Sequence, residues 1–155
     1  ITAIEAALPA IDAAANAAYQ RLSTSDNGRL IYVGAGTSAR IGVQDGAELP
    51  PTFNWPQHRI GFVIAGGEAA LLRAVENAED EADTAAAQIT NMAVGPDDVV
   101  IGLPARGNTV FPTTAITSAK QAGAVTVGIA NNSDTALLNT AEYPILLAND
   151  DQCCN

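Results

Sequence analysis

Basic residues and metal-binding side chains are scarce in this sequence. Lys and Arg total 7 against 17 Asp and Glu, which gives a net charge of −10 at pH 7. A chain with this charge offers no extended basic face to nucleic acid or to an anionic membrane, so neither is an expected partner. The single histidine, His58, and the adjacent Cys153 and Cys154 give too few ligands for a Cys/His metal site. We therefore expect no metal ion.

Long hydrophobic runs are also absent. No apolar stretch approaches the roughly 20 residues that cross a bilayer, and the N-terminus lacks the basic start and apolar segment of a signal peptide, so we expect a cytoplasmic protein. The length of 155 residues suits a single domain over 1–155. An apolar content of 48% is enough to bury a core. Because the chain starts at Ile1 without a methionine and stops at Asn155 soon after an apolar run, we expect a piece of a longer protein.

Helix-like and strand-like segments alternate along the chain. Apolar residues at spacings of three and four from Ile4 to Leu22 predict an N-terminal amphipathic helix. Short β-prone runs follow, at 30–33, 60–65, 99–103, 125–129 and 143–147. Between them we expect helices over 38–49, over 68–76 continuing through 79–92, and over 113–122. Near-continuous apolar strands separated by helices predict a doubly wound, three-layer α/β sandwich of about five parallel strands, with a helix and turn over 1–27 packed onto a core over 28–148.

The first predicted strand runs into a glycine-rich loop with the sequence GAGTSAR at 34–40. Glycines let the backbone approach a ligand closely, and the free N–H groups at the start of the next helix suit an anion. The expected guest is a phosphate, and the candidate residues that would bind it are Gly36, Thr37 and Ser38. A plain helix N-cap at Thr37 or Ser38 is the structural alternative.

The glycine spacing of this loop also matches the dinucleotide-binding fingerprint. A nicotinamide cofactor is disfavoured, because that fold expects an acidic residue about 20 positions on, at the end of the second strand. Here the second strand ends near Ala65 and leads into Gly66-Gly67. Arg40, just beyond the loop, is expected to pair either with the phosphate or with a surface acid.

Four segments, the first of which includes most of the glycine-rich loop, carry a family resemblance. They are VGAGTS at 33–38, DGAELPPTF at 45–53, IAGGE at 64–68 and AVENAED at 74–80. In this order they resemble successive motifs of the N-acetylmuramic acid 6-phosphate etherases, members of the SIS (sugar isomerase) domain superfamily. The resemblance implies a flavodoxin-like SIS domain and a lyase that cleaves the D-lactyl ether of N-acetylmuramic acid 6-phosphate. Its products would be N-acetylglucosamine 6-phosphate and D-lactate, formed without a metal or nucleotide cofactor.

The resemblance also implies two catalytic glutamates. Glu48, in the E-x-P-P-T-F segment, and Glu79, in E-x-A-E-D, match the acid and base of the family. In the ring-opened sugar one carboxylate removes the C2 proton, which the neighbouring aldehyde acidifies, and a protonated carboxyl gives its proton to the departing lactate oxygen on C3. We assign Glu79 as the base and Glu48 as the acid, whose protonated form partial burial beside Pro50 and Pro51 would favour. Without the motifs, both would be solvated carboxylates on helices.

A second loop departs from the family pattern. Family members carry A-A-S-G-R-T-P after the third strand, whereas this chain has PARGNTV at 104–110. The resemblance places the sugar phosphate on this loop as well, with Arg106 either holding the phosphate through its guanidinium or filling the pocket. The candidate residues are Arg106, Gly107, Asn108 and Thr109. Family members also extend past the fifth strand and upstream of Ile1, so the chain corresponds to about half of a typical etherase.

Two other functions stay open. A non-catalytic sugar-phosphate sensor is favoured by the lost serine of the second loop, since SIS domains also serve in regulators. An aldose–ketose isomerase shares the fold and the anion loop, but the glutamate-bearing segments resemble the etherases more closely. SIS-domain proteins usually pair, so the resemblance implies a homodimer that binds a small-molecule sugar phosphate.

Overall fold

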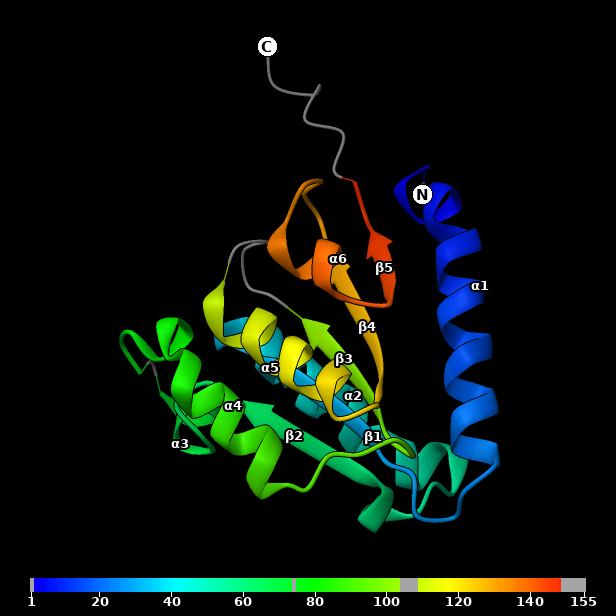
Figure 1. Cartoon of the computed structure of the whole chain (residues 1–155), viewed down its shortest axis with the longest axis horizontal. Helices are drawn as coiled ribbons and strands as arrows, with labels where there is room; N and C mark the ends of the chain where they lie inside the picture. Colours follow the sequence, from blue (N-terminus) through cyan, green and yellow to red (C-terminus); the bar gives the residue numbers. More distant parts are fainter. Residues whose placement is uncertain (1, 74, 104–108, 149–155) are drawn as a thin grey trace.

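The computed structural model describes residues 2–73, 75–103 and 109–148. Helices and strands alternate in it as the sequence predicts (Figure 1). The expected N-terminal helix is confirmed, as are all the expected strands. In chain order the elements are α1 (Thr2–Ser23), β1 (Leu30–Gly34), α2 (Gly36–Phe53), η1 (Gln57–Arg59), β2 (Ile60–Ile64), α3 (Ala69–Leu72), η2 (Ala78–Asp80), α4 (Ala82–Asn91), β3 (Val99–Leu103), α5 (Val110–Gln121), β4 (Val125–Ala130), α6 (Ala136–Thr140) and β5 (Tyr143–Leu146).

The strands form one five-stranded sheet in the order β2-β1-β3-β4-β5, and every pair is parallel. The chain moves outward from β1 to β2 and then crosses to β3 on the other side of β1. Strand order therefore reverses between β1 and β3, which is where sheets of this kind bind ligands, outside the carboxyl ends of the strands. The predicted fold class, a doubly wound α/β sandwich of flavodoxin-like order, is confirmed.

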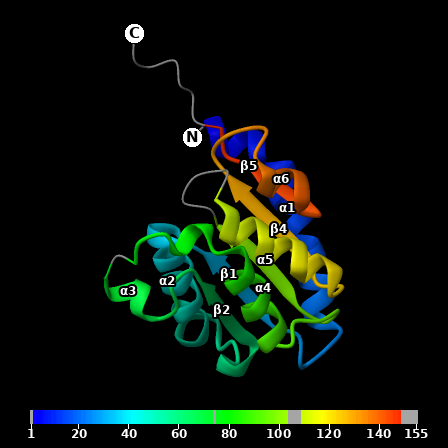
Figure 2. The ribbon, with the colours of Figure 1, turned by 60° about the vertical axis from the view of Figure 1, so that its left-hand side comes forward.

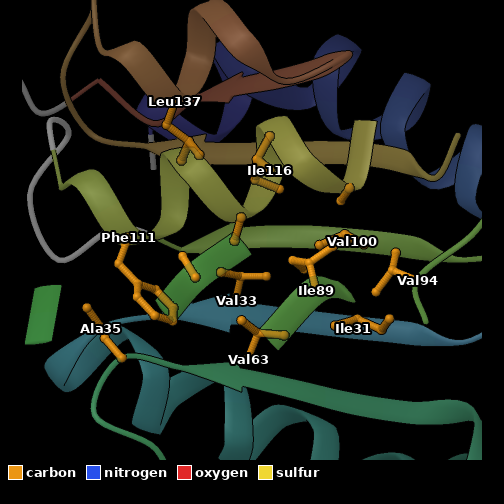
Figure 3. Close-up of a cluster of buried hydrophobic side chains, with 14 of the residues drawn as sticks. Ile31, Val33, Ala35, Val63, Ile89, Val94, Val100, Phe111, Ile116 and Leu137 are labelled. Atoms are coloured by element: carbon orange, nitrogen blue, oxygen red, sulfur yellow. The ribbon is translucent and has the colours of Figure 1, made fainter. Parts of the chain in front are cut away.

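Helices cover both faces of the sheet. Helices α4, α5 and α6 lie on one face and α1 and α2 on the other (Figures 1 and 2). The larger core lies under α4 and α5, where Ile31 and Val33 of β1 belong to one cluster with Phe111 and Ile116 of α5 (Figure 3). All four of these side chains are fully buried. Such burial is the main stabilising contribution to the fold.

Small side chains bring α1 and α2 close to the opposite face. Ala7 and Ala14 of α1 are buried against Val127 of β4 and Ile145 of β5. In α2, a Cβ added to Gly46 would lie 2.7 Å from two ring atoms of Phe62. A larger residue at 46 would therefore push α2 away from the sheet.

A buried tyrosine fixes α2 to β1. The hydroxyl of Tyr32 donates a 2.5 Å hydrogen bond to Oδ2 of Asp45 on α2, and its ring stacks with Phe62 at 6.0 Å between centroids. Burial, together with the hydrogen bond to Asp45, raises the pKa of Tyr32 above its ordinary value. Tyr32 thus stays a neutral donor, and α2 is held over the strand that leads into the glycine-rich loop.

Two of the expected helices have different ends. Helix α2 was expected over 38–49 but runs from Gly36 through Pro50 and Pro51 to Phe53. Asn54 then ends it in a left-handed conformation, with its N–H donating to the carbonyl of Pro50 at 2.9 Å. Helix α5 begins at Val110, three residues before the expected start at 113, and places Pro112 in its first turn as predicted. The short helix α6 was not predicted.

The expected helix over 68–76 and 79–92 is confirmed in part, at 69–72 and 82–91, but it is not continuous. The structure has a short α3, a 3-10 turn η2 and then α4 in its place. Arg73 is extended, with φ −147° and ψ 157°, and Asn77 is left-handed, with φ 60°. These two residues divide the segment. None of the helices in the described residues is long and apolar enough to span a bilayer.

Buried polar contacts hold the amino end of the sheet. Asp98 accepts hydrogen bonds from the Arg29 guanidinium, at 2.7 and 3.1 Å, and from the N–H groups of Arg29 and Gly95. Burial alone would raise the pKa of Asp98, but these hydrogen bonds outweigh it and hold the pKa below its ordinary value.

Arg59 stabilises the connection between α1 and β1. It is 9% exposed and donates to the carbonyls of Gly28 at 2.6 Å, Leu22 at 2.7 Å and Ser25 at 2.9 Å. Its guanidinium carbon also lies 4.6 Å from the ring centroid of Trp55. The charge is therefore satisfied by carbonyl oxygens and by an aromatic face.

Candidate active site

A pocket of about 320 Å³ lies at the carboxyl ends of β1 and β2. The first turn of α2 forms one side of it, and the segment through α3 and η2 forms the other; Figure 2 shows α2 and α3 side by side. Parallel α/β folds bind their ligands at this end of the sheet, outside the carboxyl ends of the strands. The described residues that line the pocket are Ala35, Gly36, Thr37, Arg40, Ala65, Ala70, Arg73, Val75, Glu76, Asn77, Ala78 and Glu79.

The glycine-rich loop forms the side of this pocket where the sequence predicts an anion. A Cβ at Gly34 would lie 2.8 Å from the backbone of Ala39, so only glycine lets the chain turn so tightly into α2. Gly36 has φ 55°, a left-handed conformation that favours glycine, and the space around its Cα is open. The N–H groups of the first turn lack partners within a helix and carry the positive end of the helix dipole. The loop is therefore suited to a phosphate.

The hydroxyl-bearing residues of the loop do not cap the helix. Ala35 is the N-cap of α2, with φ −128° and ψ 147°. Thr37 and Ser38 follow inside the first turn, so the alternative of a plain N-cap at either residue is wrong. Thr37 lines the pocket and is exposed.

A second glycine turn follows β2 on the same side of the sheet. Gly66 and Gly67 have φ 77° and 68°. A Cβ at Gly66 would lie 3.0 Å from the Cβ of Val75, so the segment that lines the pocket packs directly on this turn. Gln88 of α4 fixes the strand that precedes it, since its side-chain amide accepts from the N–H of Ile64 at 3.2 Å and donates to the carbonyl of Ile64 at 3.1 Å. Strand β2 is at the edge of the sheet, and Gln88 takes the place of a neighbouring strand there.

Arg40 links the two sides of the pocket. Its Nε donates to the carbonyl of Leu71 at 3.1 Å, and its Nη2 donates to the carbonyl of Ala70 at 3.1 Å. The expected partners were a phosphate or a surface acid. In the structure, Arg40 holds the end of α3 against α2 and also lines the pocket.

Glu79 lies in the pocket. It is exposed in η2, whose buried Ala78 anchors the turn to the core. The structure therefore brings Glu79, Gly36 and Thr37 together around one cavity, although they are far apart in the sequence. Glu76 lines the same cavity.

Glu48 lies elsewhere within a single copy of the chain. It is exposed on α2, roughly three turns beyond Thr37, or about 16 Å along the helix axis. It is not among the described residues that line the pocket. The expected partial burial of Glu48 is wrong, because the flanking prolines continue the helix and leave position 48 on its solvent side.

The second predicted phosphate loop is only partly described. Arg106, Gly107 and Asn108 lie outside the described residues. Thr109 is buried, with 7% of its surface exposed, at the N-cap position of α5. Its carbonyl accepts a 3.0 Å hydrogen bond from the hydroxyl of Thr113.

Sequence reasoning missed Arg73, Glu76 and Asn77 among the polar residues of the pocket. Arg73 and Asn77 line the cavity, but both fell inside a segment predicted as continuous helix. The available signal was the rarity of cations: Arg73 is one of only 7 basic residues and lies next to the glutamate-bearing motif. In the described part of the chain, no group of three or more His, Cys, Asp or Glu side chains could hold a metal ion.

Comparison with known proteins agrees with the motifs. The family described as the glucokinase regulatory protein N-terminal SIS domain matches residues 13–120. N-acetylmuramic acid 6-phosphate etherase of Deinococcus radiodurans is 47% identical over 147 residues, covering 95% of this chain and 48% of that protein. The etherase of Pasteurella multocida is 45% identical over 143 residues, covering 92% and 47%. The chain spans about half the length of these curated relatives.

Solved structures show the same fold. The phosphoheptose isomerase of Neisseria gonorrhoeae matches with a TM-score of 0.62 at 20% identity, over 96% of this chain and 78% of that chain. The sugar isomerase domain of the RpiR transcription factor from Sphaerobacter thermophilus matches with a TM-score of 0.57 at 20% identity, over 95% and 72%. The predicted resemblance to the etherases is confirmed, and the chain belongs to the SIS-domain family.

Proposed function

We propose that this chain is the SIS domain of a lyase that cleaves the D-lactyl ether of N-acetylmuramic acid 6-phosphate. The products are N-acetylglucosamine 6-phosphate and D-lactate, and the reaction takes place in the cytoplasm without a cofactor. The observation that supports this most directly is the pocket itself, which Glu79 lines together with Gly36 and Thr37 of the glycine-rich loop. The relatives that are 45–47% identical to the chain bear the name of this activity.

The sugar phosphate binds with its phosphate at the first turn of α2. The N–H groups of Gly36, Thr37 and Ser38, together with the two hydroxyls, supply donors at the positive end of an 18-residue helix. Because the chain has a net charge of −10, such local donors must offset the repulsion that the whole protein exerts on an anion. Arg106, Gly107, Asn108 and Thr109 remain candidates for the same phosphate.

Glu79 is the base that removes the C2 proton. Its carboxyl is exposed and lines the pocket, so it can accept a proton from a ring-opened sugar held there by its phosphate. Loss of that proton creates electron density that expels the lactate oxygen from C3. Water then adds to the unsaturated aldehyde, and protonation at C2 gives the product.

The acid, Glu48, reaches this chemistry from a second copy of the chain. One copy keeps Glu48 out of the pocket, yet the departing oxygen needs a proton. Glu48 lies two turns from Ile41 on the same face of α2, and Ile41 is 59% exposed. Covering Ile41 with a second copy of the chain would remove this apolar surface from water. We therefore include a homodimer, formed through this face of α2, in the proposal.

The position of Glu48 also favours a second candidate function. Without a second copy, the pocket holds the proposed base and the glycine-rich loop but lacks Glu48, the proposed acid, and this would suit a non-catalytic sugar-phosphate sensor. The lyase turns over its substrate, whereas the sensor only binds it. A sensor is stabilised by hexosamine phosphates and releases no lactate.

The test is release of D-lactate from N-acetylmuramic acid 6-phosphate by the complete protein. E79Q is expected to lower the rate by about 100- to 10,000-fold, the usual contribution of a general base. D80N is the matched control, because Asp80 is an exposed acid in the same turn but does not line the pocket. Equal loss in both variants, or none in E79Q, would contradict the role of Glu79.

A further inference from the structure

Arg73 differs from the other described cations in its contacts. Within the described residues, its side chain has no hydrogen bond or ion pair, although it lines the pocket. The other cations all donate to backbone carbonyls: Arg21, Arg29, Arg40, Arg59 and Lys120. A guanidinium that lines a pocket without a protein partner is available to a ligand.

The two arginines of the pocket have different tasks. Arg40 uses its Nε and Nη2 on the carbonyls of Leu71 and Ala70 and so fixes the end of α3. Arg73 follows directly after α3, where its extended backbone carries the chain away from the helix and into the pocket wall. Its position is therefore set by the helix end that Arg40 holds, while its own donors have no partner in the part of the chain that the structure describes.

The proposed substrate, on which this inference rests, carries two anionic groups. One is the phosphate, and the other is the carboxylate of the lactyl group. The product sugar keeps only the phosphate. Since Glu76 and Glu79 also line the pocket, a substrate carboxylate that enters it meets like charges and needs a cation beside it.

We propose that Arg73 binds the lactyl carboxylate of the substrate. A guanidinium presents two parallel N–H donors that match the two oxygens of a carboxylate. The phosphate is assigned to the first turn of α2, on the other side of the pocket, so the two anions are separated. Arg73 then selects sugar phosphates that bear a lactyl ether over those that lack one, and it retains the carboxylate while the ether bond breaks.

The experiment compares two ligands that differ by the lactyl group. Dissociation constants of N-acetylmuramic acid 6-phosphate and N-acetylglucosamine 6-phosphate are measured by calorimetry on the complete protein, with E79Q present in every variant to prevent turnover. R73Q is expected to weaken binding of the lactyl ether roughly 10- to 100-fold, the usual loss for a charge-assisted hydrogen bond. Binding of the sugar without the lactyl group should change less than about twofold. R73K keeps the charge without the paired donors, so it should bind the lactyl ether more weakly than the protein with Arg73 and more tightly than R73Q.

K120Q is the control for charge alone. Lys120 is exposed in the last turn of α5, donates to the carbonyl of Thr140 and does not line the pocket, and its removal changes the net charge equally. It should alter neither constant. If R73Q weakened binding of both ligands equally, the proposal would be overturned, because Arg73 would then contact the phosphate. If R73Q changed neither dissociation constant, the proposal would be overturned as well. Lactate release by E79Q would instead overturn the catalytic role of Glu79, while the ratio of the two constants alone decides the role of Arg73.

Discussion

Replacement of Arg59 by Met should destabilise the fold strongly although the residue is far from the pocket. The guanidinium satisfies three carbonyls, at 2.6, 2.7 and 2.9 Å, and lies over Trp55. Hydrogen bonds to a charged donor contribute about 1.5–3 kcal/mol each, and the aromatic contact adds about 1 kcal/mol. Removing a buried charge regains several kcal/mol of desolvation free energy. The free energy of unfolding should therefore fall by about 3 kcal/mol rather than by the full sum.

Urea unfolding followed by circular dichroism measures this loss, with R59K and K120M alongside. R59K keeps the charge but replaces the branched donor by a single ammonium, so it should lose about half as much. K120M removes an exposed amine that donates to one carbonyl, at 2.9 Å, and should cost less than about 1 kcal/mol. A loss in R59M no larger than that in K120M would refute the account of Arg59.

Three further results are expected. Because the pKa of Asp98 is held below its ordinary value, its contribution to stability is present at neutral pH and is lost as the pH falls below about 4 toward the folded-state pKa; D98N should flatten the acid side of a plot of urea midpoint against pH. G46A should cost about 1–3 kcal/mol, because its Cβ would lie 2.7 Å from the ring of Phe62, and a shift below 0.5 kcal/mol would mean that α2 moves freely. G36A places a side chain at φ 55°, so it should weaken inorganic phosphate binding in a thermal-shift assay while costing only about 1 kcal/mol of stability.

The sheet and its layers were predictable because each strand has a local signature. Runs such as LIYVG at 30–34 are apolar throughout and end in glycine, which is typical of a strand buried on both faces. The alternation of such runs with helices leaves few topologies. The tight glycine turn from β1 into α2 was predictable for the same reason, since its glycines are close together in the sequence.

The segment between β2 and α4 was not predictable from apolar spacing. Its residues have helical periodicity, but the Cβ of Val75 packs at the turn of Gly66, and Asn77 adopts a left-handed conformation. These features depend on contacts with Gly66 and with the core beneath Ala78, which local patterns do not record. The same dependence on tertiary structure explains why Arg73 was missed as a pocket residue.

Glu48 illustrates a second limit of sequence reasoning. Its motif is specific, but the expected burial beside Pro50 and Pro51 assumed that the helix ends there. The backbone continues to Phe53 instead, because the left-handed Asn54 supplies the helix end. A motif can thus match a catalytic residue to a family without showing where its side chain lies in one copy of the chain.

The central claim is that Glu79 removes the C2 proton of a lactyl ether bound at the loop of Gly36. The most direct measurement is the reaction of N-acetylmuramic acid 6-phosphate with the complete protein in D2O. The account predicts equal amounts of D-lactate and N-acetylglucosamine 6-phosphate, with deuterium at C2 of the sugar and almost no product from E79Q. Product that keeps protium at C2, or release of lactate by E79Q at the wild-type rate, would contradict it.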